Sequence, residues 1–176
     1  MTPPGASLKN TVLIPLHNAT LEKQLAQRDS DLLLGNARVL QRAADPAKTT
    51  ALLRGKNLAL LCESEDGADA VLFRSAASAL GAHVSHVRPR FSDLGKADEF
   101  QHTARMLGRL YDGIECQGIA PELVEVIGRE AGVPVYDGLA SLRHPTAPLA
   151  AMLDGEASPV RQRELILQTV LLSTLA

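Results

Sequence analysis

The sequence has few aromatic residues, two cysteines and no tryptophan. Aromatic side chains make up 3% of its 176 residues, which argues against nucleic-acid binding by base stacking. No apolar run approaches the roughly 18 residues that a membrane-spanning helix needs, and the first residues lack the basic and apolar segments of a signal peptide. The formal net charge is −2, so no polyanionic partner is expected. We therefore expect a cytoplasmic domain without a nucleic-acid or membrane partner.

The cysteine and histidine residues do not form a pattern typical of a metal site. Cys62 and Cys116 fall in short apolar runs, so two buried, reduced thiols are expected. His83 and His86 are three residues apart, a spacing that places them on opposite faces of a strand. Four acidic side chains between residues 63 and 69 could attract Mg²⁺ or Ca²⁺, but no calcium-loop spacing is present. The sequence therefore indicates no metal site and no cofactor.

Short apolar runs alternate with amphipathic segments along the chain. The runs typical of buried parallel strands lie at about 57–62, 83–87, 113–116 and 134–136. Helices are predicted at about 30–44, with Ser30 as N-cap, and at 69–80, 99–110, 121–131, 144–153 and 159–175. This alternation predicts an α/β fold, a single three-layer domain with a four-stranded parallel sheet flanked by helices.

The segment between the first predicted strand and its helix contains acids and no base. It reads Ser64-Glu65-Asp66-Gly67-Ala68-Asp69. A helix N-terminus that follows a strand commonly binds anions through its free amides and its dipole. Here Asp66 or Asp69 is expected to cap those amides, and the acidic side chains repel a phosphate dianion. The turn is therefore predicted to be a poor phosphate site.

Five collinear blocks of the sequence match one protein family. These blocks are Gly55–Leu61, Leu80–Val84, Thr103–Ile114, Gly132–Leu139 and His144–Thr146. They resemble the aspartate/ornithine carbamoyltransferase family, and ornithine carbamoyltransferase most of all. Together they span residues 53–154 and resemble the half of the family's fold that binds carbamoyl phosphate, a far more specific match than one short motif.

The resemblance also implies a domain organisation. Residues 1–18 would be an N-terminal extension, 19–154 an α/β domain like the carbamoyl-phosphate domain, and 155–176 a C-terminal helix that returns to pack on the same domain. The family's second half, which binds the amino acid, is expected to be absent, with a short turn after Asp154 in its place. An unrelated amphipathic helix that closes the sheet is the alternative for the last segment.

The pocket that the resemblance implies has changed side chains. The family's Ser-Thr-Arg-Thr-Arg motif aligns with Asp66–Ala70, so both arginines and all three hydroxyls are replaced. A further arginine aligns with Gln117, and the glutamine of the His-Pro-x-Gln motif aligns with Ala147, which leaves His144 as the retained ligand. The vestigial pocket would comprise Asp66, Gly67, Ala68, Asp69, Ala70, Gln117, His144 and Ala147, with no catalytic residue.

A loop at the family's subunit boundary aligns with Ser92, Asp93, Leu94, Gly95 and Lys96. Asp93 replaces a glutamine that reaches the neighbouring subunit's site. Since family members assemble as trimers through this half, the resemblance implies a homotrimer or a hetero-assembly with a full-length transcarbamoylase.

Three functions fit these observations. The first is a catalytically inactive relative that acts by protein association or regulation. The second is a small-molecule binding module whose acidic pocket prefers an amine, a guanidinium or a metal ion. The third is a carbamoyltransferase subunit completed by another chain, which would have to supply the arginines and the amino-acid domain. Charge-assisted hydrogen bonds contribute about 1.5–3 kcal/mol each, so the loss of three arginines favours the first.

Overall fold

The computed structural model describes residues 27–43, 49, 52–90 and 97–176. The predicted N-terminal extension, residues 1–18, and the loop Ser92–Lys96 lie outside these residues. The elements are, in order, α1 (Gln27–Arg42), β1 (Asn57–Leu61), α3 (Ala68–Ala79), β2 (His83–Val87), α4 (Ala97–Leu110), β3 (Gly113–Cys116), α5 (Pro121–Glu130), β4 (Val135–Asp137), the 3-10 helix η3 (Ala147–Met152) and α6 (Pro159–Leu175).

The described strands form one parallel sheet in the order β2-β1-β3-β4. Asn57 pairs with His83, and Leu58 pairs with Gly113. From β1 the chain first crosses to β2 on one side and then passes to β3 on the other side, so the connections change direction between β1 and β3. In open parallel sheets, binding sites form at the carboxyl ends of the strands at such a switch point. The predicted α/β fold with a four-stranded parallel sheet is confirmed.

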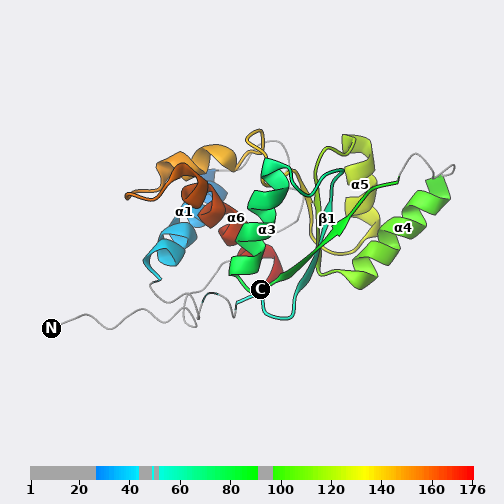
Figure 1. The fold of residues 1–176 in the computed structure, drawn as a ribbon, viewed down its shortest axis with the longest axis horizontal. Coiled ribbons are helices and arrows are strands. Elements are labelled where there is room, and N and C mark those ends of the chain that lie inside the picture. The colour runs from blue at the N-terminus through cyan, green and yellow to red at the C-terminus, as the bar shows by residue number, and fades with distance from the viewer. Residues whose placement is uncertain (1–26, 44–48, 50–51, 91–96) are drawn as a thin grey trace.

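Two layers of helices cover the sheet, with α1, α3 and α6 on one side and α4 and α5 on the other (Figure 1). Successive strand residues point to opposite faces. Leu58 and Leu60 accordingly pack in the core with α3 and α6, whereas Ala59 and Leu61 pack in the core with α4 and α5. This arrangement explains why the strands are continuous apolar runs and do not alternate between polar and apolar residues.

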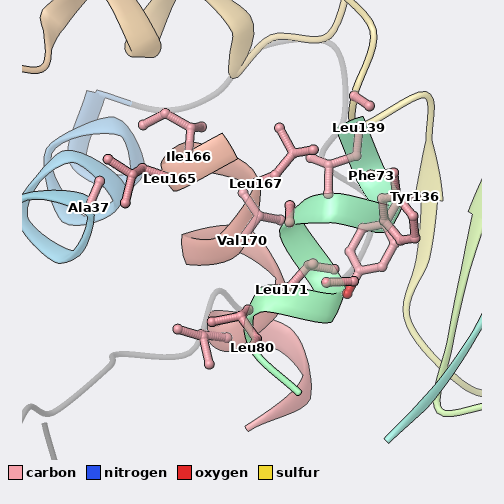
Figure 2. Close-up of a cluster of buried hydrophobic side chains, with 14 of the residues drawn as sticks. Ala37, Phe73, Leu80, Tyr136, Leu139, Leu165, Ile166, Leu167, Val170 and Leu171 are labelled. Carbon is pink, nitrogen blue, oxygen red and sulfur yellow. The ribbon is translucent and has the colours of Figure 1, made fainter. Parts of the chain in front are cut away.

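Helix α6 runs through the core and not along its surface. Its apolar side chains pack among α1, α3 and η3 (Figure 2). Four buried polar or charged side chains lie on this helix: Arg163, Gln168, Thr169 and Ser173. Two of them bond to their own helix: Thr169 Oγ1 donates to the carbonyl of Leu165 at 2.9 Å and Ser173 Oγ donates to that of Thr169 at 2.8 Å. These bonds replace the hydrogen bonds that the hydroxyl groups would otherwise make with water. Helix α6 thus packs against α1, α3 and η3.

The turn that joins η3 to α6 is fixed at both ends. Ser158 is the N-cap of α6, and its Oγ accepts from the backbone N–H of Arg161 at 3.2 Å. Gln41 of α1 donates from Nε2 to the carbonyl of Asp154 at 2.7 Å. The chain therefore passes from one helix to the next in a few residues, held against α1.

Helices α4 and α5 approach closely at Gly108. A Cβ at this position would lie 1.8 Å from the carbonyl oxygen of Ala131, just after α5. By contrast, Gly128 in α5 has no neighbouring atom within 4 Å of such a Cβ. Only glycine at position 108 allows the observed contact between the two helices.

Two details of the predicted helices are wrong. The helix expected at 144–153 is a 3-10 helix limited to Ala147–Met152. Pro145 disfavours helical backbone at His144, and Pro148 has no N–H to donate to the carbonyl of His144, which accepts at 2.8 Å from Ala147 instead. Ser30 is not an N-cap, because α1 already includes Gln27. Among the described residues, no helix combines the length and apolar character needed to cross a membrane.

Candidate functional site

The carboxyl ends of β1, β3 and β4 bring most of the predicted pocket residues to one edge of the sheet. The acidic turn follows β1, Gln117 follows β3, and the segment 138–146 follows β4. This edge includes the switch point between β1 and β3, where a site is expected from the topology alone.

The acidic turn after β1 forms an ion pair with a base in the helix that follows it. Glu65 and Asp66 are exposed, whereas Asp69 is half-buried. Arg74 of α3 donates from Nη2 to Glu65 Oε2 at 3.2 Å and to the Glu65 carbonyl at 3.4 Å. His86 Nδ1 lies 3.8 Å from the same carboxylate. The base nearest the turn is therefore already paired with one of its acids.

The predicted capping of α3 by Asp66 or Asp69 is wrong. The N-cap is Gly67, and no side chain in the described part of the chain caps the first amides of the helix. Asp66 instead donates its backbone N–H to Ser64 Oγ at 3.3 Å. The acids thus act on the helix terminus by charge and not by capping.

The small residues of the predicted pocket lie in different environments. Gly67 and Ala68 are exposed at the start of α3. Ala70 is 1% exposed and belongs to the core that contains α6. Ala147 is half-buried at the start of η3. Of the two positions aligned with family arginines in this turn, only position 68 therefore faces solvent.

Glu115 is a buried acid at the switch point that the sequence analysis did not identify. Its side chain is 0% exposed. Oε2 accepts from the backbone N–H of Leu139 at 3.2 Å, and Oε1 accepts from Gln117 Nε2 at 3.1 Å and from the N–H of Ala140 at 3.5 Å. Burial raises the pKa of Glu115 to about 8, and the hydrogen bonds from these donors act in the opposite direction. A charged residue in the otherwise apolar predicted strand 113–116 was the available signal.

Arg163 is the second residue that the sequence analysis missed. It comes from α6 and is 5% exposed. Nη2 donates to the carbonyls of Leu139 at 2.6 Å and Ser141 at 3.1 Å, and Nη1 donates to Thr146 Oγ1 at 3.2 Å. Its buried Nε has no partner among the described residues. Burial lowers the pKa of Arg163, and the nearby negative charges of Asp69 and Glu115 oppose that shift.

His144, the retained pocket residue, is buried and neutral. Its Nδ1 accepts from the backbone N–H of Thr146 at 3.3 Å and lies 2.8 Å from Thr146 Oγ1. Because Thr146 Oγ1 accepts from Arg163, its own proton is free to point toward Nδ1, which places the ring proton on Nε2. Burial and then the charge of Arg163 lower the pKa of His144 to about 4.

The structure therefore brings Glu115, Gln117, His144 and Arg163 around the segment after β4. No group of three metal-ligating side chains occurs in the described part of the chain. The predicted buried, unpaired thiols Cys62 and Cys116 are confirmed.

A separate surface cavity of about 220 Å³ lies on α4. It is lined by His102, Arg105, Met106 and Arg109. The guanidinium of Arg105 lies 2.8 Å from the Glu130 carboxylate. Arg109 makes no ion pair with the residues that the structure describes. This cavity shares no lining residue with the site at the carboxyl edge of the sheet.

Comparisons with known proteins agree with the fold. Residues 18–155 match the family model for the aspartate/ornithine carbamoyltransferase, carbamoyl-P binding domain. Ornithine carbamoyltransferase of Actinobacillus pleuropneumoniae serotype 5b is 38% identical over 147 residues, which are 84% of this chain and 42% of that protein. A catabolic ornithine carbamoyltransferase of Staphylococcus epidermidis is 39% identical over 127 residues, or 72% of this chain and 38% of the relative.

Solved structures show the same domain. Ornithine carbamoyltransferase from Pyrococcus furiosus has a TM-score of 0.59 at 28% identity, covering 71% of this chain and 40% of that one. The catalytic subunit of M. jannaschii aspartate transcarbamoylase, at 22% identity and a TM-score of 0.58, shares the fold over 72% of this chain and 42% of its own. The chain spans about two fifths of the length of these proteins. It belongs to the aspartate/ornithine carbamoyltransferase family and represents its carbamoyl-phosphate-binding domain.

Proposed function

We propose that this domain does not transfer carbamoyl groups by itself and acts by associating with protein chains, either further copies of itself or a longer carbamoyltransferase. The observation that carries the proposal is the charge of the turn at the switch point. Its side chains Glu65 and Asp66 are exposed acids, and the neighbouring base Arg74 is held by Glu65. A phosphate dianion that approached this turn would meet like charge.

Arg163, the other cation of the site, already makes hydrogen bonds within the domain. Arg163 uses both terminal nitrogens on the carbonyls of Leu139 and Ser141 and on Thr146. Bidentate recognition of phosphate needs two adjacent guanidinium N–H groups directed at the ligand. Nε has no partner among the described residues and Nη1 makes one bond, but both N–H groups of Nη2 are engaged. A bidentate grip on phosphate that uses Nη2 would therefore have to break internal bonds.

The free amides of α3 do not compensate for this loss. A helix dipole contributes about 0.3–1 kcal/mol at an exposed terminus, whereas each charge-assisted hydrogen bond contributes about 1.5–3 kcal/mol. The magnitudes therefore favour a domain whose family fold is kept and whose phosphate chemistry is lost. We extend this to association because the resemblance implies that this half of the family's fold carries the subunit contacts, and we place the contact at the loop Ser92–Lys96.

Sedimentation velocity of the full chain tests the proposed association. We expect a trimer, or a defined complex when the chain is mixed with a full-length ornithine carbamoyltransferase. Asp93→Ala and Lys96→Ala in the predicted boundary loop should weaken this assembly, while Glu122→Ala, on the exposed first turn of α5, serves as the matched surface control. A monomer at high concentration that also ignores the longer enzyme would contradict the proposal.

A further inference from the structure

Arg163 of α6 holds both ends of the segment that follows β4. Its Nη2 donates to the carbonyls of Leu139 at 2.6 Å and Ser141 at 3.1 Å, near the start of the segment. Its Nη1 donates to Thr146 Oγ1 at 3.2 Å, at the end of the segment. A guanidinium is planar and presents its donors in a fixed fork, so these three bonds set where Thr146 lies relative to Leu139. His144 lies in the chain between the two ends.

Thr146 transmits this constraint to the ring of His144. The backbone N–H of Thr146 donates to Nδ1 of the ring at 3.3 Å, and Thr146 Oγ1 lies 2.8 Å from the same nitrogen. A backbone N–H can only donate, so Nδ1 has to be the unprotonated nitrogen. Because a guanidinium has no acceptor, Oγ1 accepts from Arg163, and its single proton is left for Nδ1. Both contacts from Thr146 therefore select the neutral ring with its proton on Nε2.

All three residues of this hydrogen-bonded chain, Arg163, Thr146 and His144, are buried. Water therefore competes weakly for the bonds, and each bond polarises the next. A proton added to Nδ1 would face the N–H of Thr146, would break both contacts and would put a second positive charge close to Arg163. Burial and then the charge of Arg163 lower the pKa of His144 to about 4, in agreement with a ring that the geometry holds neutral.

We propose that Arg163 is a positioning residue for His144: acting through Thr146, it keeps the ring neutral with its proton on Nε2. The last helix of the chain thereby determines which ring nitrogen can donate at the carboxyl edge of the sheet. Nε2 has no partner among the described residues, so its proton is available to an acceptor, whereas Nδ1 is closed to protons and metal ions. The inference is independent of the proposed function, because it concerns the ring in the chain without a ligand.

Proton–nitrogen correlation NMR of the full chain with isotope-labelled histidine tests the assignment, because it distinguishes the two tautomers and follows ring protonation. A His144→Gln spectrum identifies the His144 signals among those of the five histidines. We expect one tautomer, protonated on Nε2, in the unmodified chain. Arg163→Met and Thr146→Val should each raise the pH midpoint of ring protonation by about one pH unit or more, a tenfold gain in proton affinity. Arg161→Met is the matched control, since it removes an exposed arginine of the same helix that pairs with Glu164.

Thr146→Ser separates the hydroxyl from the packing of the side chain, because it keeps the hydroxyl and loses only the methyl group. It should leave the midpoint close to that of the unmodified chain. The inference is overturned if the unmodified ring carries its proton on Nδ1, or if a folded Arg163→Met protein shows the same midpoint as Arg161→Met. Equal shifts in Thr146→Ser and Thr146→Val would also overturn it, since they would show a packing effect. Should Arg163→Met fail to fold, the two Thr146 variants decide the matter.

Discussion

The core around α6 and the acidic turn before α3 are adjacent in the fold but are built under different constraints. The core is apolar and closed: Phe73, Leu167 and Val170 are 0% exposed. The turn is exposed and charged, and its acids repel the ligand that the same turn would bind in the family's domain. Helix α3 belongs to both, with Ala70 in the core and Asp69 at the site.

If the proposed function is right, this difference means that the fold and the anion site can be separated. Packing of α3 on α6 needs apolar residues at the buried positions of each helix and places no demand on the exposed residues of the preceding turn. Acids could therefore replace the ligand-binding side chains without loss of the core. The following predictions test this separation, beginning with the largest expected effect.

Truncation of a core side chain on α6 should be costly. Leu167→Ala should lower the free energy of unfolding by about 2–5 kcal/mol, because it leaves a cavity at a fully buried site. Val160→Ala in the same helix, at a position 68% exposed, should change it by no more than about 0.5 kcal/mol. Urea denaturation measures both. Equal losses for the two variants would mean that α6 is not the buried centre of the domain.

The contact between α4 and α5 should be sensitive to a single methyl group. Gly108→Ala should lower the free energy of unfolding by about 1–3 kcal/mol, because its Cβ would collide with the carbonyl of Ala131. Gly128→Ala should instead raise stability by about 0.5–1 kcal/mol, since the new methyl group meets nothing and the helix gains backbone preference. Thermal melts of the pair are the measurement, and a stabilised Gly108→Ala protein would refute the close packing.

The buried acid at the site should make stability depend on pH. The pKa of Glu115 is about 8 in the folded chain against 4.5 for an ordinary glutamate, so between these values the folded state holds a proton that the unfolded state lacks. The free energy of unfolding should therefore fall as pH rises toward 8, by at most about 1.4 kcal/mol per pH unit.

His144 has the opposite effect at lower pH. Its pKa is lowered from 6.5 to about 4, so its contribution to stability is lost as pH falls through that range. The window from 6.5 to 8 therefore isolates Glu115. Glu115→Gln should remove the decline in this window, measured by urea denaturation at several pH values. A decline that persists in the variant would show that another group is responsible.

Changes in the exposed turn should have the smallest effect on stability. Ala68→Arg should alter the free energy of unfolding by about 0.5 kcal/mol or less, because position 68 faces solvent. Ala70→Arg is its matched contrast, since that side chain would enter the core. We also expect no carbamoyl transfer from the Ala68→Arg protein in a colorimetric assay, and turnover there would contradict the proposed function.

The sheet and most helices could be predicted because burial on both faces leaves a local signature. Strands such as 57–61 and 113–116 are apolar runs whatever lies around them. The 3-10 helix after β4 could not be predicted in this way, because its form depends on which carbonyls Pro145 and Pro148 leave available. Local hydrogen bonding overrode the apolar spacing there.

The site was only half predictable. Asp66 and Gln117 could be placed because each lies in the segment that follows a predicted strand. Arg163 could not, since its role depends on α6 crossing the core to reach the backbone after β4. Its approach to Thr146 and Leu139 joins segments that are distant in sequence, and only the tertiary structure shows it.

The most direct test of the central claim is a calorimetric titration of the full chain with carbamoyl phosphate at low salt, with inorganic phosphate as the control. Low salt favours binding, because screening of charges is weakest there. We predict no saturable heat for either ligand up to millimolar concentrations. Saturable one-to-one binding of carbamoyl phosphate would show that the amides of α3, His144 and Arg163 still form a working site, and would contradict the claim that the family fold has been kept without its phosphate chemistry.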